Sequence, residues 1–260
     1  MNIITNKYYI TRTGEFATDA NKKIAYTLLG LSLCYHDYIE RNTTEYISVF
    51  IGSSIFWTFI ELFLNITKSR VINPMTIKLR NKFKLPVNKY IGIILQGTQE
   101  GGVVTIIGLY FGDRLFSLYY QSIYHLIIFY MMMNMLYKKS KLKIRSRRQI
   151  NTPSSLMIMG TVSVYNAITI YYNQSHIYRI ITMFLSMIYI SSVWTYVSYK
   201  KMFRNVETEI SDKNGHYNLI DTSKNTIFNV LMYDILFEIG IAYVTFYNLF
   251  IIHLPILHKS

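Results

Sequence analysis

The chain has 260 residues, of which 51% are hydrophobic and only 16% are charged, a balance that ordinary soluble domains rarely show. Lysine and arginine outnumber aspartate and glutamate by 27 to 14, which gives a formal net charge of +13. The cations lie between long apolar runs instead of forming one basic surface, so they indicate membrane topology and not a nucleic-acid site. The single cysteine, Cys34, excludes an internal disulfide framework and multi-cysteine metal centres, and we predict no metal site.

Seven segments are candidates for transmembrane helices, which need roughly 20 residues to cross a hydrocarbon core of about 30 Å. In chain order they are 24–40, 46–66, 90–111, 115–137, 154–173, 177–199 and 226–253. The first 20 residues contain charges and no apolar core of a signal peptide, so the first helix is expected to insert uncleaved. We therefore predict an all-α fold: a seven-transmembrane-helix bundle that forms a single domain over 1–260.

Basic residues alternate from one connection to the next. They gather in the N-terminal segment 1–22, in the second connection up to Lys89, in the fourth connection up to Arg148, and in the loop 200–225. The other connections and the tail after His253 are poor in cations. The positive-inside rule then places the N-terminus in the cytoplasm and the C-terminus outside. Within the last basic loop, 206–221 is expected to be a surface loop with a turn at Asn214-Gly215.

Ionisable or strongly polar groups inside the predicted helices are candidates for function, because burying them in lipid is costly. Counting inward from the loop ends places these near the membrane midplane: Glu100, His125, Asn166, Asp234 and Glu238. Glu61 falls closer to the cytoplasmic end. The spacing of Asp234 and Glu238, and of Gln96 and Glu100, puts each pair on one helix face.

No lysine or arginine of the predicted helices shares that depth, so at least one of the three acids is expected to be protonated at neutral pH. The alternative is structural: each acid is a carboxylic acid hydrogen-bonded to a neighbouring helix, which is a common packing device between spans. His125 has no histidine or cysteine at ligand spacing and predicts no metal site.

The order of the helices with the N-terminus inside resembles the heliorhodopsins and is inverted relative to ordinary rhodopsins. The run from Met232 to Tyr243 looks like the helix that carries the retinal lysine, with Glu238 at the lysine position and Asp234 one turn before it. The run from Gln96 to Gly108 is similar to the third helix of the family, with Gln96 at the counterion position and Glu100 one turn on.

The resemblance extends over about 22–255, through Phe50 to Ile60 and through Ser191 to Lys200, which contains Trp194. Thr58 and Leu29 stand where the family has histidines. Because a retinal Schiff base needs a lysine, and the predicted seventh helix has none, the resemblance implies a scaffold without covalent retinal. Its pocket would take non-covalent retinal or another apolar ligand, and it would be lined by Gln96, Glu100, Asp234, Thr58 and Trp194. The family also implies a homodimer in the lipid bilayer.

Three functions follow as hypotheses. The first is a heliorhodopsin-like sensor, ligand-binding or regulatory membrane protein that acts through the former retinal pocket. The second is a proton or cation conductor with an acidic relay of Glu61, Glu100, His125, Asp234 and Glu238. The third is a membrane-embedded lipid enzyme with the acids as general acid and base. The chain has no nucleophile elbow, phosphate loop or metal-ligand set, so an enzyme is not expected.

Two short runs echo one another along the chain. Residues 53–59 resemble 191–196, and Glu100-Gly-Gly resembles Glu238-Ile-Gly. A three-plus-one-plus-three helical repeat, as in some small transporters, would produce these matches. Chance in an apolar background of low complexity would produce them too.

Overall fold

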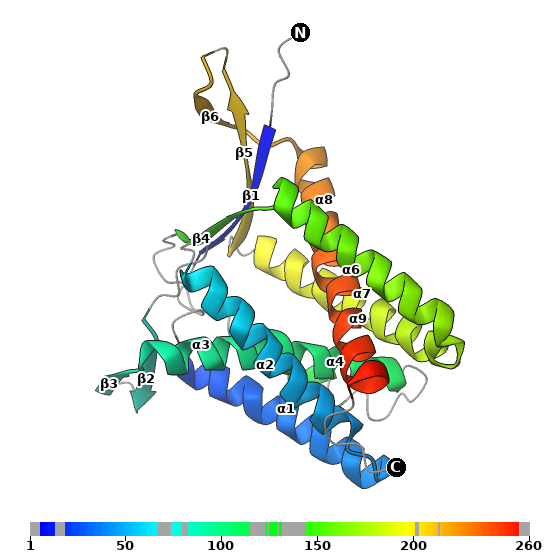
Figure 1. The fold of residues 1–260 in the computed structure, drawn as a ribbon. Coiled ribbons are helices and arrows are strands. Elements are labelled where there is room, and N and C mark those ends of the chain that lie inside the picture. Colours follow the sequence, from blue (N-terminus) through cyan, green and yellow to red (C-terminus); the bar gives the residue numbers. More distant parts are fainter. Residues whose placement is uncertain are drawn as a thin grey trace.

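A computed structural model of the chain describes residues 6–13, 19–66, 74–79, 83–114, 123, 125–128, 130–131, 144–200, 203–212 and 214–254. Helices make up most of these residues, as predicted, but a four-stranded antiparallel sheet lies at one end of the helices (Figure 1). The expectation of an all-α fold was therefore wrong in this respect. The predicted segment 115–137 lies largely outside the described residues.

The first half of the chain contains one strand, a hairpin and three helical segments. They are β1 (Asn6–Thr13), α1 (Ala20–Arg41), α2 (Glu45–Ile66), β2 (Thr76–Leu79), β3 (Phe83–Pro86), and a continuous helix made of α3 (Lys89–Gly97), η2 (Thr98–Val103) and α4 (Val104–Asp113). The η2 segment is π-helical. An Asn88 side chain caps α3 by accepting a hydrogen bond from the Tyr90 amide.

The second half repeats this order. It contains β4 (Ile144–Gln149), α6 (Pro153–Tyr172), a short 3-10 turn η3 (Gln174–His176) that leads into α7 (Ile177–Lys200), β5 (Arg204–Ser211), β6 (Tyr217–Ile220), and a long helix made of α8 (Lys224–Tyr233), η4 (Asp234–Ile241), α9 (Ala242–Tyr247) and η5 (Asn248–His253). The η4 and η5 segments are π-helical. Thr152 and Ser223 cap α6 and α8 with their hydroxyl groups.

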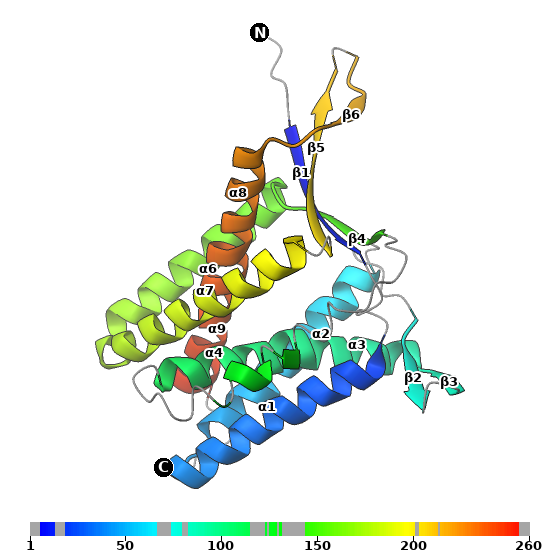
Figure 2. The same ribbon diagram turned by 180° about the vertical axis from the view of Figure 1, so that it is seen from behind.

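Within the described residues, each half thus contains a strand, two helices, a hairpin and a third helix. In both halves the third helix lies between the other two: α3–α4 between α1 and α2, and α8–η5 between α6 and α7 (Figures 1 and 2). In both halves this third helix changes to π geometry, at η2 and at η4. The similar runs 53–59 and 191–196 lie in α2 and α7, which are the second helices of the two halves, as a repeat requires.

Three of the described helices are long and apolar enough to cross a membrane, judged by length and composition: Glu45–Ile66, Gln174–Lys200 and Lys224–His253. They correspond to the second, sixth and seventh predicted spans. The first, third and fifth predicted spans are helical, as α1, α3–α4 and α6. The count of seven spans and their orientation stay predictions.

The sheet has the strand order β4-β1-β5-β6 and is built from three segments that were expected to be loops. Side chains alternate between its two faces. Ile10 of β1 pairs with Arg148 of β4 and with Val206 of β5. Ile10 and Val206 pack on Val230 of α8, so this face of the sheet looks toward the helices. The expected loop 206–221 is a strand pair instead, and Asn214-Gly215 lies in its turn, where Gly215 has a φ of +82°.

All four basic segments of the sequence come to this end of the molecule. Three of them contribute strands to the sheet, and the fourth forms the β2–β3 hairpin beside the start of α1, where Asp19 and Thr76 form a bridge. The last helix ends at the opposite end (Figure 1). The segments predicted to share one side of a membrane therefore lie together.

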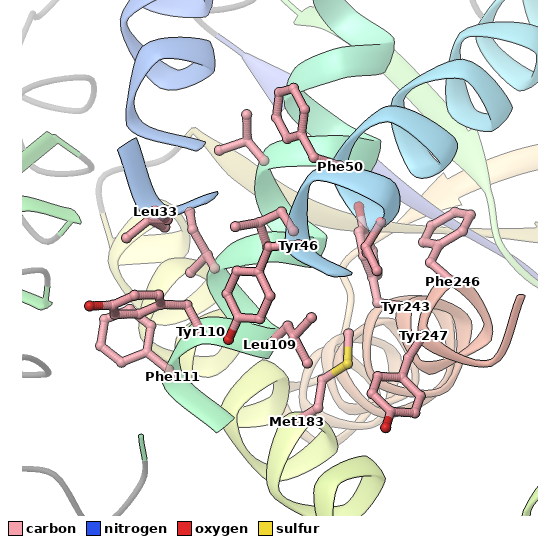
Figure 3. Close-up of a cluster of buried hydrophobic side chains, with 14 of the residues drawn as sticks. Leu33, Tyr46, Phe50, Leu109, Tyr110, Phe111, Met183, Tyr243, Phe246 and Tyr247 are labelled. Atoms are coloured by element: carbon pink, nitrogen blue, oxygen red, sulfur yellow. The ribbon is translucent and has the colours of Figure 1, made fainter. Parts of the chain in front are cut away.

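The core between the halves is rich in aromatic side chains (Figure 3). Tyr46, Tyr110 and Tyr247 are completely buried there. Close backbone approaches hold α4 against α7: a Cβ added at Gly112 would lie 2.7 Å from the backbone nitrogen of Met183. Small residues allow this kind of contact between helices.

Candidate functional site

Three arginines of the sheet point to the helix-facing side. Arg12 of β1 lies directly opposite Arg204 of β5, and Arg148 of β4 lies opposite Ile10, which packs toward α8. Side chains alternate along a strand, and Arg12 follows Ile10 by two residues, so the two side chains lie on the same face. Arginines so close together need acidic partners, since like charges opposite each other in a sheet repel.

The partners of two of these arginines are the acids of η4. An Nη1 of Arg204 lies 2.8 Å from Oδ2 of Asp234, and both side chains are only 3% exposed. One nitrogen of Arg148, Nη2, is shared by Asp234, at 3.1 Å, and Glu238. Asp234 and Glu238 therefore share one helix face, as their spacing predicts. Thr195 of α7 accepts a further hydrogen bond from Arg204, at 2.8 Å.

Glu100 occupies the corresponding π-helical segment, η2, in the first half. Its carboxylate lies 3.5 Å from Nη1 of Arg12 and accepts hydrogen bonds from Trp57, at 3.3 Å, and from Gln96. The Tyr243 hydroxyl, from α9, donates to the backbone carbonyl of Glu100. This last contact joins the two third helices.

We call Arg12, Glu100, Arg148, Arg204, Asp234 and Glu238 the sheet-side ion cluster. The expectation that no cation reaches the acids was wrong, because the arginines come from strands that the sequence presents as basic loops. Glu100 and Glu238 lie about midway along their helices, Lys89–Asp113 and Lys224–His253, and the arginines of the sheet reach them there. The depth of the acids in a membrane stays a prediction.

The opposite face of the sheet carries a separate, exposed ion group. Arg147 lies 2.7 Å from Glu207 and 2.7 Å from Glu209, and Tyr9 donates to Glu209 at 3.0 Å. The hydrogen bond from Arg147, with that from Tyr9, holds the pKa of Glu209 below its usual value. This group faces away from the helices and provides a control for the sheet-side ion cluster.

Beyond the acids of η4, polar side chains form two hydrogen-bonded groups along the contact between α6 and the last helix. The Asn166 amide donates to the Ile241 carbonyl at 2.9 Å and to the Thr245 hydroxyl at 3.1 Å. Asn248 donates to Asn166 at 2.8 Å. We call the row formed by the following residues the polar ladder: Asn166, Thr169, Thr245, Asn248 and His253.

The ladder ends at the far end of the molecule, where Thr169 and His253 lie within 3.2 Å. Asn166 and Asn248 are buried, whereas His253 is exposed. Fifteen residues separate Glu238 from His253, which at 1.5 Å per helical residue is roughly 22 Å, most of the thickness of a hydrocarbon core.

A second ion network closes the far end of the molecule. Arg179 of α7 lies 2.7 Å from Asp113 of α4 and 2.7 Å from Glu45 of α2. Arg114 and Asp37, both buried, lie 2.9 Å apart. This network ties the second half of the chain to the first at the end opposite the sheet.

The other predicted site residues lie apart from the cluster or at its edge. Thr58, on α2, donates to the Ser54 carbonyl and lies against Gly97 of α3. Trp194 packs on the aromatic core, and Glu61 is completely buried on α2. The proposed relay through His125 is not supported by its described contacts, which are Tyr189, at 3.3 Å, and the ring of Phe111.

Sequence reasoning missed the arginines and the end of the ladder. A signal was present for Arg204 alone, because Val206 to Ile210, which follows it, alternates between apolar and polar residues as a strand does. The runs around Arg12 and Arg148 show no such alternation. His253 gave no such signal, because a histidine at the end of a helix ordinarily contacts water.

No family model, no curated protein and no solved structure matches the chain. The resemblance to heliorhodopsins, and the apolar ligand and homodimer that it implies, therefore stay predictions.

Proposed function

We propose that this protein is a multi-pass membrane protein that conducts protons, with seven helices and with its sheet on the cytoplasmic side. Three sufficiently apolar helices support a location in the membrane. The gathering of all four basic segments at the sheet end supports the orientation, since cations concentrate on the cytoplasmic side.

One observation carries the proposal: the acids of η4, the hydrogen-bonded group of Asn166, Thr245 and Asn248, and the pair of Thr169 and His253 follow one another toward the far end of the last helix. Carboxylates and histidine exchange protons, ordered water and hydroxyl groups carry protons between such sites, and amide groups orient the water. Glu238 is the entry on the sheet side, and His253 is the exit.

The role of Arg148 in this proposal is to position the entry. Its guanidinium contacts both Glu238 and Asp234 and so holds the two carboxylates together on the side of the helix that faces the sheet. Protonation of Glu238 weakens its ion pair with Arg148, and the proton then passes to ordered water that the amide of Asn166 orients.

The π-helical geometry of η4 is a second reason to place the proton path in this segment. A π segment leaves backbone carbonyls without their ordinary helical partners and is common at functional positions. The Ile241 carbonyl, at the end of η4, accepts from Asn166 in this way. Broken helices at matching positions of two repeats also mark the ion sites of small transporters.

The experiment is proton uptake by liposomes that contain the purified protein and a pH-sensitive dye, driven by a potassium diffusion potential. We expect uptake well above that of protein-free liposomes. Glu238→Gln should reduce it at least tenfold, whereas Glu209→Gln, an acid of the opposite sheet face, should leave it unchanged. Uptake equal to that of empty liposomes, or equal rates in wild type and Glu238→Gln, would contradict the proposal.

A further inference from the structure

We infer that the β2–β3 hairpin is an interfacial membrane anchor that binds acidic phospholipid headgroups. The hairpin projects from the sheet end of the helices beside the start of α3 (Figures 1 and 2). It belongs to a separate two-stranded sheet and takes no part in the proposed proton path. Its two strands pair only with each other, and its support within the chain comes from the starts of α1 and α3.

The register of the hairpin separates its side chains into two faces. Ile77 pairs with Leu85, and Phe83 lies two residues before Leu85 on the same strand, so these three apolar side chains share one face. Phe83 is 68% exposed and Leu85 is 50% exposed. An exposed face of this kind fits the acyl boundary of a bilayer.

The other face is basic. Lys78 and Lys84 lie directly opposite each other across the two strands. Like charges in this position destabilise a hairpin unless an anion lies against them. Lys78 is 3.9 Å from Asp19, and Lys84 is exposed on the outer strand, with Lys89 at the start of α3. Lys84 and Lys89 are both exposed, and acidic headgroups are the anions that such side chains meet at a membrane surface.

The hairpin is held in a fixed position relative to the helices. Asn21, in the first turn of α1, makes two hydrogen bonds to the backbone of Lys78, at 2.7 Å and 3.1 Å. Met75, immediately before β2, is buried against Gly92 of α3. Tyr90, Ile91 and Ile94 at the start of α3 are exposed too, and they add to the apolar surface that the chain offers to lipid after the hairpin.

The test uses single cysteines with spin labels at positions 83, 84 and 85 in a Cys34→Ala background, in nanodiscs that contain one quarter phosphatidylglycerol. Cys34 is buried, so its replacement serves only to exclude stray label. We expect labels at 83 and 85 to be accessible to oxygen dissolved in the lipid, and the label at 84 to be accessible to a water-soluble nickel complex. Equal nickel access at all three positions would overturn the inference. So would exclusion of both reagents at 83 and 85 with spin coupling between copies, because the apolar face would then be a dimer contact.

Lipid preference is measured with spin-labelled phosphatidylglycerol and phosphatidylcholine. Lys84→Gln with Lys89→Gln should lower the preference for phosphatidylglycerol at least twofold. Lys224→Gln, which removes an exposed lysine at the same end of the molecule but away from the hairpin, should not change it. An unchanged preference in the hairpin variant would overturn the assignment of acidic lipid as the partner.

Discussion

Arg147 and Arg148 follow one another on β4, and their guanidinium groups bind acids on opposite sides of the same sheet. Arg147 binds Glu207 and Glu209 on the exposed face, whereas Arg148 binds the acids of η4. The alternation of a β-strand thus separates a surface ion group from one that joins the sheet to the helices.

This pair gives a first prediction about stability. Arg148→Gln leaves two nearly buried carboxylates with fewer charged partners, and we expect a loss of about 2 kcal/mol or more in the free energy of unfolding. Arg147→Gln removes an exposed pair and should cost about 1 kcal/mol or less. Thermal unfolding in detergent, followed by circular dichroism, measures both. Equal midpoints for the two variants would show that Arg148 does not hold the sheet to η4.

The contact between the two halves gives a second prediction. Gly112 lies against the backbone of Met183, which has no room to move away from a larger side chain. Gly112→Leu should lower the free energy of unfolding by about 3 kcal/mol, the upper part of the range for overpacking. Gly160→Leu on α6 is the matched control, since no atom lies within 4 Å of a Cβ added there. The same melting experiment would contradict the close approach if both variants behaved like wild type.

A third prediction concerns the pH dependence of the exposed sheet face. The pKa of Glu209 is lowered mainly by its hydrogen bond from Arg147. A lowered folded-state pKa means that Glu209 stabilises the sheet above its unfolded pKa of about 4.3, and that this contribution is lost as the pH falls through the folded value. A carbon-13 NMR titration of the Glu209 carboxyl should have a midpoint below the ordinary one, and Arg147→Gln should raise it. A midpoint that Arg147→Gln leaves unchanged would contradict the assigned cause.

The heliorhodopsin hypothesis has its own test, which is a fourth prediction. With Arg148 against position 238, we expect no visible absorption band when all-trans-retinal is added to wild type or to Glu238→Lys. A band in Glu238→Lys alone would place position 238 at the site of the family's retinal lysine, and would favour the sensor hypothesis over proton conduction.

The helices were largely predictable from the sequence. The three most apolar runs became α2, α7 and the helix from Lys224 to His253, and the Asn214-Gly215 turn was also expected. Hydrophobic runs and turn residues act locally, so they can be recognised without the fold.

The sheet was not predicted, and the interpretation of the site changed because of it. Its strands come from three distant segments. Their lysines and arginines were interpreted only as markers of cytoplasmic loops. Asn166 was correctly singled out as a polar group inside a helix, but its partners on the last helix depend on α8–η5 lying between α6 and α7. A single sequence does not specify that order of helices.

Asn166 provides the most direct test of the proton path, because it contacts both Thr245 and Asn248 in the middle of the polar ladder. The measurement is the initial rate of proton uptake by liposomes that carry Asn166→Leu, compared with Thr161→Leu, which replaces an exposed residue on the same helix. We predict at least a tenfold loss for Asn166→Leu and wild-type rates for Thr161→Leu. Wild-type uptake by a folded Asn166→Leu protein would contradict the path from Glu238 to His253.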